Sequence, residues 1–305
     1  MTFAQIKHRL SQGRPLVLDS DTGAAFRARG VSLDTPGALG QLLRTNEAGV
    51  LAHYQAEVHS RVDVLSALTA DTTPRALAEV GMQHRSALLT GRAVDLAFEA
   101  AAYAGKPVAI AGILGSDMVS PIDPSRLAEE LEEHADRIAA AGCELLVVRG
   151  QGSRFGLMAA VTAAARTGLP TWAVLEAVPE GDFNETQYAD LWVNLASAGV
   201  TLVLFEVTQV EQAVRSLDSV QSFAIDPKLS VGVLLAGSAA SVRGFPDEDS
   251  DVRRWVTRAA DLASHGARVI GGGAGTSEAH TEALAIALGE LHPSVPASGH
   301  GEPSS

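Results

Sequence analysis

The chain has 305 residues, of which 46% are hydrophobic and 19% charged, so it can form a large core and is not disordered over most of its length. The formal net charge of -13 argues against nucleic acid as the main partner, because phosphate backbones bind to basic faces. Cys143 is the only cysteine, which excludes an intramolecular disulfide and a zinc site built from several cysteines.

Neither a membrane span nor a secretory signal is recognisable in the sequence. No apolar run approaches the roughly 20 residues that cross a bilayer, and the basic N-terminal segment lacks an apolar signal-peptide core. We therefore expect a soluble, cytoplasmic protein that does not contact a membrane. The Pro-, Ser- and Gly-rich residues 292–305 are expected to form a disordered tail after a single folded domain over residues 1–291.

Eight short apolar runs recur along the chain and are predicted to be strands. They are almost continuously apolar rather than alternating, which is typical of strands in a parallel sheet that is covered on both faces. In chain order the runs are Leu16–Asp19, Asp63–Leu68, Pro107–Gly112, Glu144–Val148, Thr171–Glu176, Thr201–Val207, Val231–Ala236 and Arg268–Gly273.

Segments with helical periodicity follow seven of these runs. Several end at a glycine directly before the next strand, as helix C-caps commonly do. The predicted helices are Pro74–Tyr103, Pro124–Ala141, Gly156–Thr167, Glu185–Ala198, Val210–Leu217, Val252–Ser264 and Glu278–Leu288, and the closing glycines are Gly105, Gly142, Gly168, Gly199 and Gly266.

Eight strands that alternate with helices predict an α/β fold, a single (β/α)8 TIM barrel, in preference to a doubly wound sheet. The segments after the first and seventh strands, about residues 21–39 and 237–250, are predicted to be long loops. Such loops lie at the catalytic face of a barrel, where the strands end.

Charged residues occur at several predicted strand ends and make candidate site residues. Asp19, Glu176 and Glu206 are candidate general bases, and Arg149 is a candidate clamp for a substrate carboxylate. A ring of acids around one arginine suits a zwitterionic substrate. In the alternative interpretation, each acid is a solvated loop residue or an ion-pair partner of Arg149. The glycine-rich loop at residues 271–276 is a candidate anion site.

Two other features have a structural interpretation that we favour over a functional one. His53 and Glu57 are spaced to share a helix face, as metal ligands do, but their segment precedes a strand and belongs to the outer helical layer. Cys143 lies just before the fourth strand, at the opposite end of the barrel from the catalytic face, and is expected to be a buried structural thiol.

Several motifs resemble those of the homocysteine S-methyltransferase family, which includes the betaine–homocysteine and S-methylmethionine–homocysteine enzymes. Residues 18–23 (LDSDTG) resemble its opening LDGGMGT, and residues 266–276 (GARVIGGGAGT) resemble its closing GAxIIGGCCGT. Residues 108–116 (VAIAGILGS) resemble its VAGSIGP more loosely, and Thr69 matches the end of its TNT strand. The resemblance covers about residues 16–290 and implies a (β/α)8 barrel.

The family binds zinc through three cysteines, and this chain has none of them. The corresponding positions are Val207, Gly273 and Ala274, so zinc is not expected and no cofactor is predicted. Arg149 stands where the family has an acidic residue that holds the substrate amine, whereas Asp19 is retained. The predicted strand ends and the matching motifs together give the candidate substrate-binding residues Asp21, Thr22, Gly23, Thr69, Arg149, Gly272 and Gly273.

Three hypotheses for function follow. The first is a zinc-independent enzyme that acts on a small zwitterionic or anionic substrate, either by methyl transfer from a sulfonium or betaine donor or by acid–base chemistry of the lyase or hydrolase type. The second is a non-catalytic ligand-binding or regulatory family member, and the third is an ordinary homocysteine methyltransferase with an unusual metal site. The expected partner is a small molecule, such as a sulfur-containing amino acid or a methyl donor, and a homo-oligomer is left open.

Overall fold

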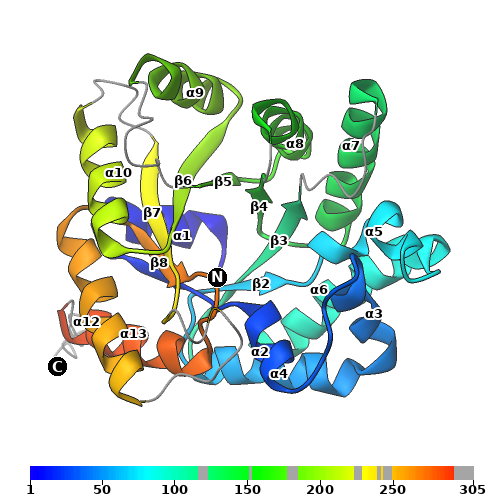
Figure 1. Cartoon of the computed structure of the whole chain (residues 1–305), viewed down its shortest axis with the longest axis horizontal. Helices are drawn as coiled ribbons and strands as arrows, with labels where there is room; N and C mark the ends of the chain where they lie inside the picture. The colour runs from blue at the N-terminus through cyan, green and yellow to red at the C-terminus, as the bar shows by residue number, and fades with distance from the viewer. Residues whose placement is uncertain are drawn as a thin grey trace, which may run out of the picture.

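A computed structural model describes residues 1–115, 123–150, 153–176, 185–222, 229–238, 242 and 249–291. Eight parallel strands pair in chain order and close into a barrel, because β1 pairs with both β2 and β8 (Figure 1). The predicted (β/α)8 TIM barrel is therefore confirmed. The expected disordered tail, residues 292–305, and most of the predicted loop at residues 237–250 lie outside the described residues.

All eight predicted apolar runs form strands of the barrel. The strands are β1 (Leu16–Leu18), β2 (Val64–Ala67), β3 (Ala109–Gly115), β4 (Leu145–Arg149), β5 (Thr171–Glu176), β6 (Val200–Val207), β7 (Ser230–Leu235) and β8 (Val269–Gly272).

Helices surround the barrel, and the first half of the chain contains more of them than the sequence predicted. They are α1 (Phe3–Ser11), α2 (Thr22–Ala28), α3 (Ala38–Thr45), α4 (Glu47–His59), α5 (Pro74–Ala78), α6 (Ser86–Ala101), α7 (Pro124–Ala140), α8 (Arg154–Arg166), α9 (Glu185–Ser197), α10 (Val210–Ser222), α12 (Asp249–Ser264) and α13 (Glu278–Leu291), with 3-10 turns η1 (Ala70–Thr72) and η2 (Gln83–Arg85).

Three predictions of local structure were wrong. The helix predicted over Pro74–Tyr103 is divided into α5, η2 and α6, because Gly81 adopts φ 69 and the chain leaves the helical conformation there. The predicted loop at residues 21–39 contains the short helix α2, which continues directly from the loop after β1. By contrast, Gly142, Gly168, Gly199 and Gly266 all have positive φ, as expected for helix C-caps. Gly105 does not have positive φ and follows the end of α6 at Ala101 only after several residues, so its predicted role as a helix cap was wrong.

Successive side chains along each strand point alternately into and out of the barrel, which divides the hydrophobic core into two layers. Inward residues such as Leu145, Val147, Trp172 and Val174 form the cluster inside the barrel, while the outward residues pack against the helices. Ile6 of α1 is fully buried and belongs to the inner cluster. Helix α1 therefore covers the N-terminal end of the barrel.

The structure confirms the expectation for the single cysteine. Cys143 is a buried free thiol, and burial raises its pKa to about 12, so it is not a reactive nucleophile at neutral pH. No helix in the described part of the chain is long and apolar enough to cross a membrane.

Trp172 is expected to carry a large share of the stability of the barrel interior. Its side chain is fully buried, and its indole N–H has no hydrogen-bond partner among the described residues. Trp172→Ala should lower the free energy of unfolding by about 3–5 kcal/mol through the cavity that it leaves. Trp172→Phe removes the unpartnered N–H and should cost less than about 1.5 kcal/mol. Urea denaturation of both variants tests this, and equal losses would contradict it.

Candidate active site at the mouth of the barrel

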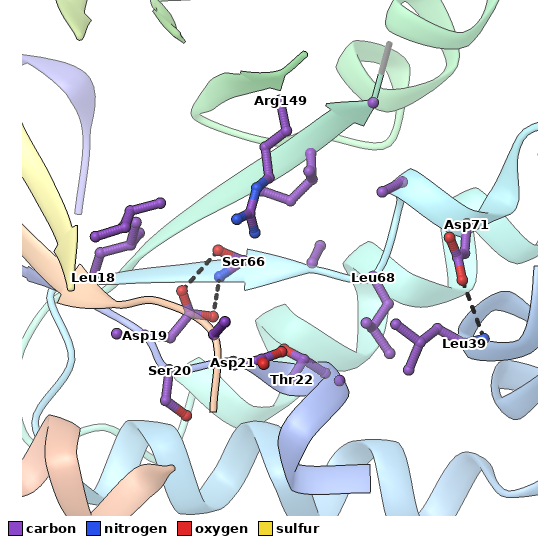
Figure 2. Close-up of a pocket in the computed structure, with 18 of the residues that line it drawn as sticks. Leu18, Asp19, Ser20, Asp21, Thr22, Leu39, Ser66, Leu68, Asp71 and Arg149 are labelled. Atoms are coloured by element: carbon purple, nitrogen blue, oxygen red, sulfur yellow. Dashed lines mark hydrogen bonds between the residues drawn. The ribbon is translucent and has the colours of Figure 1, made fainter. Parts of the chain in front are cut away.

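A cavity of about 590 Å³ opens at the C-terminal ends of the strands. The loops after β1 and β2 form one side of it, and the ends of β3, β4, β6, β7 and β8 contribute the rest (Figure 2). Of the predicted site residues, the cavity is lined by Asp19, Asp21, Thr22, Gly23, Arg149, Glu206 and Gly272. The strand ends thus bring together most of the residues that the sequence singled out.

Strand alternation explains why Arg149 and Glu206 meet. Arg149 follows the inward residues Leu145 and Val147 on β4, and Glu206 follows the inward residues Leu202 and Leu204 on β6. Their side chains form an ion pair of 2.8 Å between the Arg149 Nη2 and the Glu206 Oε1. The alternative interpretation of Glu206, as a partner of Arg149, therefore describes the structure.

Glu176 is an exposed residue at the end of β5, beside Glu206 in the sheet. It does not line the cavity, and its role as a base stays a prediction. Arg149 still has donors to offer, because a guanidinium carries five N–H groups and only one bond to Glu206 is formed among the described residues.

Asp19 is the most deeply buried carboxyl group that lines the cavity, with only 4% of its surface exposed. Both of its oxygens accept hydrogen bonds from Ser66 on β2: Oδ2 from the backbone N–H at 2.8 Å and Oδ1 from the hydroxyl at 2.7 Å. Burial raises the pKa of Asp19 to about 6, although these bonds and the charge of Arg149 act in the opposite direction. A carboxyl group with such a pKa can exchange protons near neutral pH.

Asp21 joins the loop after β1 to the glycine-rich loop after β8. Its Oδ2 accepts the backbone N–H of Gly275 at 2.9 Å, and its own N–H donates to the Thr276 hydroxyl at 3.1 Å. The sequence predicted that backbone N–H groups of the glycine-rich loop bind a substrate anion. One of these groups, the N–H of Gly275, is instead bound by the Asp21 carboxylate. Arg27 also contacts Asp21, at 3.4 Å.

His53 and Glu57, two buried polar residues of α4, form hydrogen bonds to the loop after β1. The sequence analysis assigned neither of them a role in the site. The Ser20 hydroxyl donates a short hydrogen bond to Glu57, and the Thr22 hydroxyl lies 3.2 Å from His53 Nε2. Burial lowers the pKa of His53 to about 3 and raises that of Glu57 to about 8, with a further contribution from the charge of Asp19. Both are therefore neutral at pH 7. Their helical spacing was the only signal in the sequence.

Thr69, a predicted substrate-binding residue, joins two strands through its hydroxyl group. Its fully buried hydroxyl donates to the Ile113 carbonyl at 2.8 Å and accepts the Ile113 N–H at 2.7 Å, so it joins the end of β2 to β3. His134 bonds to the Thr69 carbonyl at 2.9 Å. Thr69 does not line the cavity, and its contact with substrate stays a prediction.

The three positions at which the resemblance places zinc ligands do not fit a metal. Val207 is buried and apolar, and Gly273 and Ala274 have no donor side chain. A Cβ atom on Gly273 would lie 2.9 Å from the Ala236 nitrogen and 3.0 Å from the Leu235 carbonyl carbon, closer than side chains approach a backbone. Among the described residues, no three His, Cys, Asp or Glu side chains are grouped as metal ligands would be.

The close approach at Gly273 predicts that even the smallest side chain is unfavourable there. Gly273→Ala should lower the free energy of unfolding by about 1–3 kcal/mol, because the backbone of β7 or β8 must shift. Gly91→Ala is the matched control: Gly91 lies within α6 with open space around it, so this change should be neutral or stabilising. The prediction fails if both variants have the stability of the parent in urea denaturation.

The raised pKa of Glu57 predicts a specific dependence of stability on pH. A carboxyl group whose pKa is raised by folding binds its proton more tightly in the folded state, so its contribution is complete below about pH 4.5 and decreases as the pH rises toward about 8. Glu57→Gln should therefore gain stability relative to the parent over this window, by at most about 1.4 kcal/mol per pH unit. Urea denaturation at pH 4.5, 6 and 8 measures the difference, and a constant difference would contradict the raised pKa.

Comparisons with known proteins place this barrel in a family. The family model described as homocysteine S-methyltransferase matches residues 16–288, and no curated protein matches. The structure of the homocysteine methyltransferase MmuM from Escherichia coli, in its metallated form, aligns with a TM-score of 0.70 and 17% identity, covering 92% of this chain and 99% of that chain. Its apo form aligns with a TM-score of 0.67.

Barrel enzymes with other activities resemble this chain less closely. The type I 3-dehydroquinate dehydratase from Clostridium difficile has a TM-score of 0.54 and 10% identity, covering 93% of this chain and 94% of that chain. At such identities structural likeness shows the fold alone, whereas the family model matches most of the sequence. The chain belongs to the homocysteine S-methyltransferase family, as its opening and closing motifs predicted.

Proposed function

We propose that this chain is a methyltransferase that transfers a methyl group from a sulfonium or betaine donor to a small zwitterionic or anionic acceptor without zinc. Family membership supports methyl transfer. The proposed substrate class rests on two features of the cavity: the buried Asp19, with a pKa of about 6, and the Arg149–Glu206 ion pair. In Figure 2 the Arg149 side chain extends from β4 toward Ser66 and Asp19.

In this proposal the substrate carboxylate binds the donors of Arg149 that Glu206 leaves available, and Glu206 holds the guanidinium in place. A substrate amine or other proton-bearing nucleophile faces Asp19. The acceptor atom attacks the donor methyl group and forms the new bond to carbon. The leaving group keeps the electron pair of the broken bond, and the acceptor's proton passes to Asp19. The lack of donor side chains at Val207, Gly273 and Ala274 supports a route that does not use zinc.

A methyl-transfer assay by mass spectrometry tests the proposal. The full chain, freed of metal with a chelator, is mixed with homocysteine or other small amino acids as acceptors and with S-methylmethionine or glycine betaine as donors. Sustained product formation is expected. Activity that appears only after zinc is added would support the ordinary family chemistry with an unusual site, and saturable ligand binding without product would support the binding-protein hypothesis.

Two substitutions test the assigned roles. Asp19→Asn should lower kcat by about 100-fold or more, because the proton acceptor is lost. Arg149→Gln should mainly raise KM for the carboxylate-bearing substrate, by about tenfold or more. Arg44→Gln, at an exposed residue of α3 outside the cavity, is the control for the loss of one positive charge. Parent values of kcat and KM in both cavity variants would show that the reaction does not use this cavity.

A further inference from the structure

A second cavity, of about 340 Å³, lies at the opposite end of the barrel from the proposed active site. It is formed around the starts of β1, β2 and β3, beside helix α1, and α13 provides an apolar wall that includes Leu288. Four cationic residues line it: Arg9, Arg14, Arg61 and Lys106.

Among the described residues that line this cavity, Asp63 is the one acidic residue, and its carboxylate is already fully engaged. It accepts hydrogen bonds from Arg9 at 2.5 Å, from Lys106 at 2.6 Å and from the Val17 N–H at 2.9 Å. Asp63 therefore fixes two of the cations at the wall while neutralising a single charge. The described lining holds Arg9, Arg61 and Lys106 against this one carboxylate. In a chain whose net charge is -13, this arrangement gives a local field that attracts anions.

The backbone at Arg61 gives a second, independent observation. Arg61 follows α4 with φ 63, and it is the only residue other than glycine with positive φ in the described part of the chain. At the ends of α7 and α8, Gly142 and Gly168 fill the corresponding left-handed position. A side chain is disfavoured in this conformation, so local folding favours glycine over arginine.

Contacts within the described part of the protein do not explain why an arginine occupies position 61. The Arg61 side chain is exposed at the rim of the cavity and forms no hydrogen bond or ion pair within the described residues. Unfavourable backbone conformations that persist without local benefit are characteristic of binding sites.

We propose that this second cavity, at the N-terminal face of the barrel, binds a small, multiply charged anion that carries phosphate or several carboxylate groups. Arg61 contributes an uncompensated guanidinium, Asp63 orients Arg9 and Lys106, and the wall at α13 accommodates an apolar part of the ligand. The site is separate from the mouth of the barrel and does not depend on the proposed methyl transfer.

Isothermal titration of the full chain with pyrophosphate, and separately with citrate, tests the site and distinguishes the two chemistries. Saturable binding of one of them is expected, and the affinity should fall as ionic strength rises. Arg61→Gly should weaken this binding by about fivefold or more, while raising Tm by about 2 °C because glycine suits the left-handed backbone. A variant that is more stable but binds less well cannot be explained by damage to the fold.

Two controls locate the binding. Arg44→Gln removes an exposed arginine on another helix and should leave the affinity unchanged, as should Arg149→Gln at the barrel mouth. The proposal is overturned if neither anion binds saturably at millimolar concentration, if Arg61→Gly binds as tightly as the parent, or if Arg149→Gln abolishes binding.

Discussion

The loop between β1 and α2 is held by hydrogen bonds from three directions, and the geometry of the candidate active site depends on it. Ser66 on β2 binds Asp19, the loop after β8 binds Asp21 through Gly275 and Thr276, and Glu57 of α4 binds Ser20. Each bond comes from a different element of the barrel. The two carboxylates of this loop, Asp19 and Asp21, and the Ser20 hydroxyl between them are therefore fixed by the closed sheet and its outer helix together, and not by the loop itself.

The sequence predicted the barrel well because parallel strands that are buried on both faces must be apolar along their whole length. The same logic predicted the position of Arg149 and Glu206, since residues at strand ends converge on one face. Glycine positions predicted the helix ends less reliably. Gly142 marks a helix end as expected, but Gly81 divides a segment that has continuous helical periodicity. At Gly81 the left-handed backbone conformation interrupts the helix although the hydrophobic pattern of the sequence continues.

The partners of the polar side chains could not be predicted in this way. Arg149 meets Glu206, and Asp21 meets Gly275, through the closure of the sheet, which joins residues that lie far apart in the chain. Likewise, the spacing of His53 and Glu57 shows that they share a helix face but does not show which loop covers them. The structure adds this information: Glu57 belongs to the outer helical layer as predicted, and it also supports the loop beneath the site.

Helix α1 has a consequence for the order of events in the proposed reaction. Among the described residues, Ile6 lies in the inner core at the N-terminal end of the barrel and Trp172 helps to fill its interior, so Asp19 is reached through the cavity at the C-terminal face. Donor and acceptor then share a single entrance, and the one that lies deeper must enter first and leave last. A barrel closed in this way favours a compulsory order of binding and release, in which the shallower ligand traps the deeper one until transfer is complete.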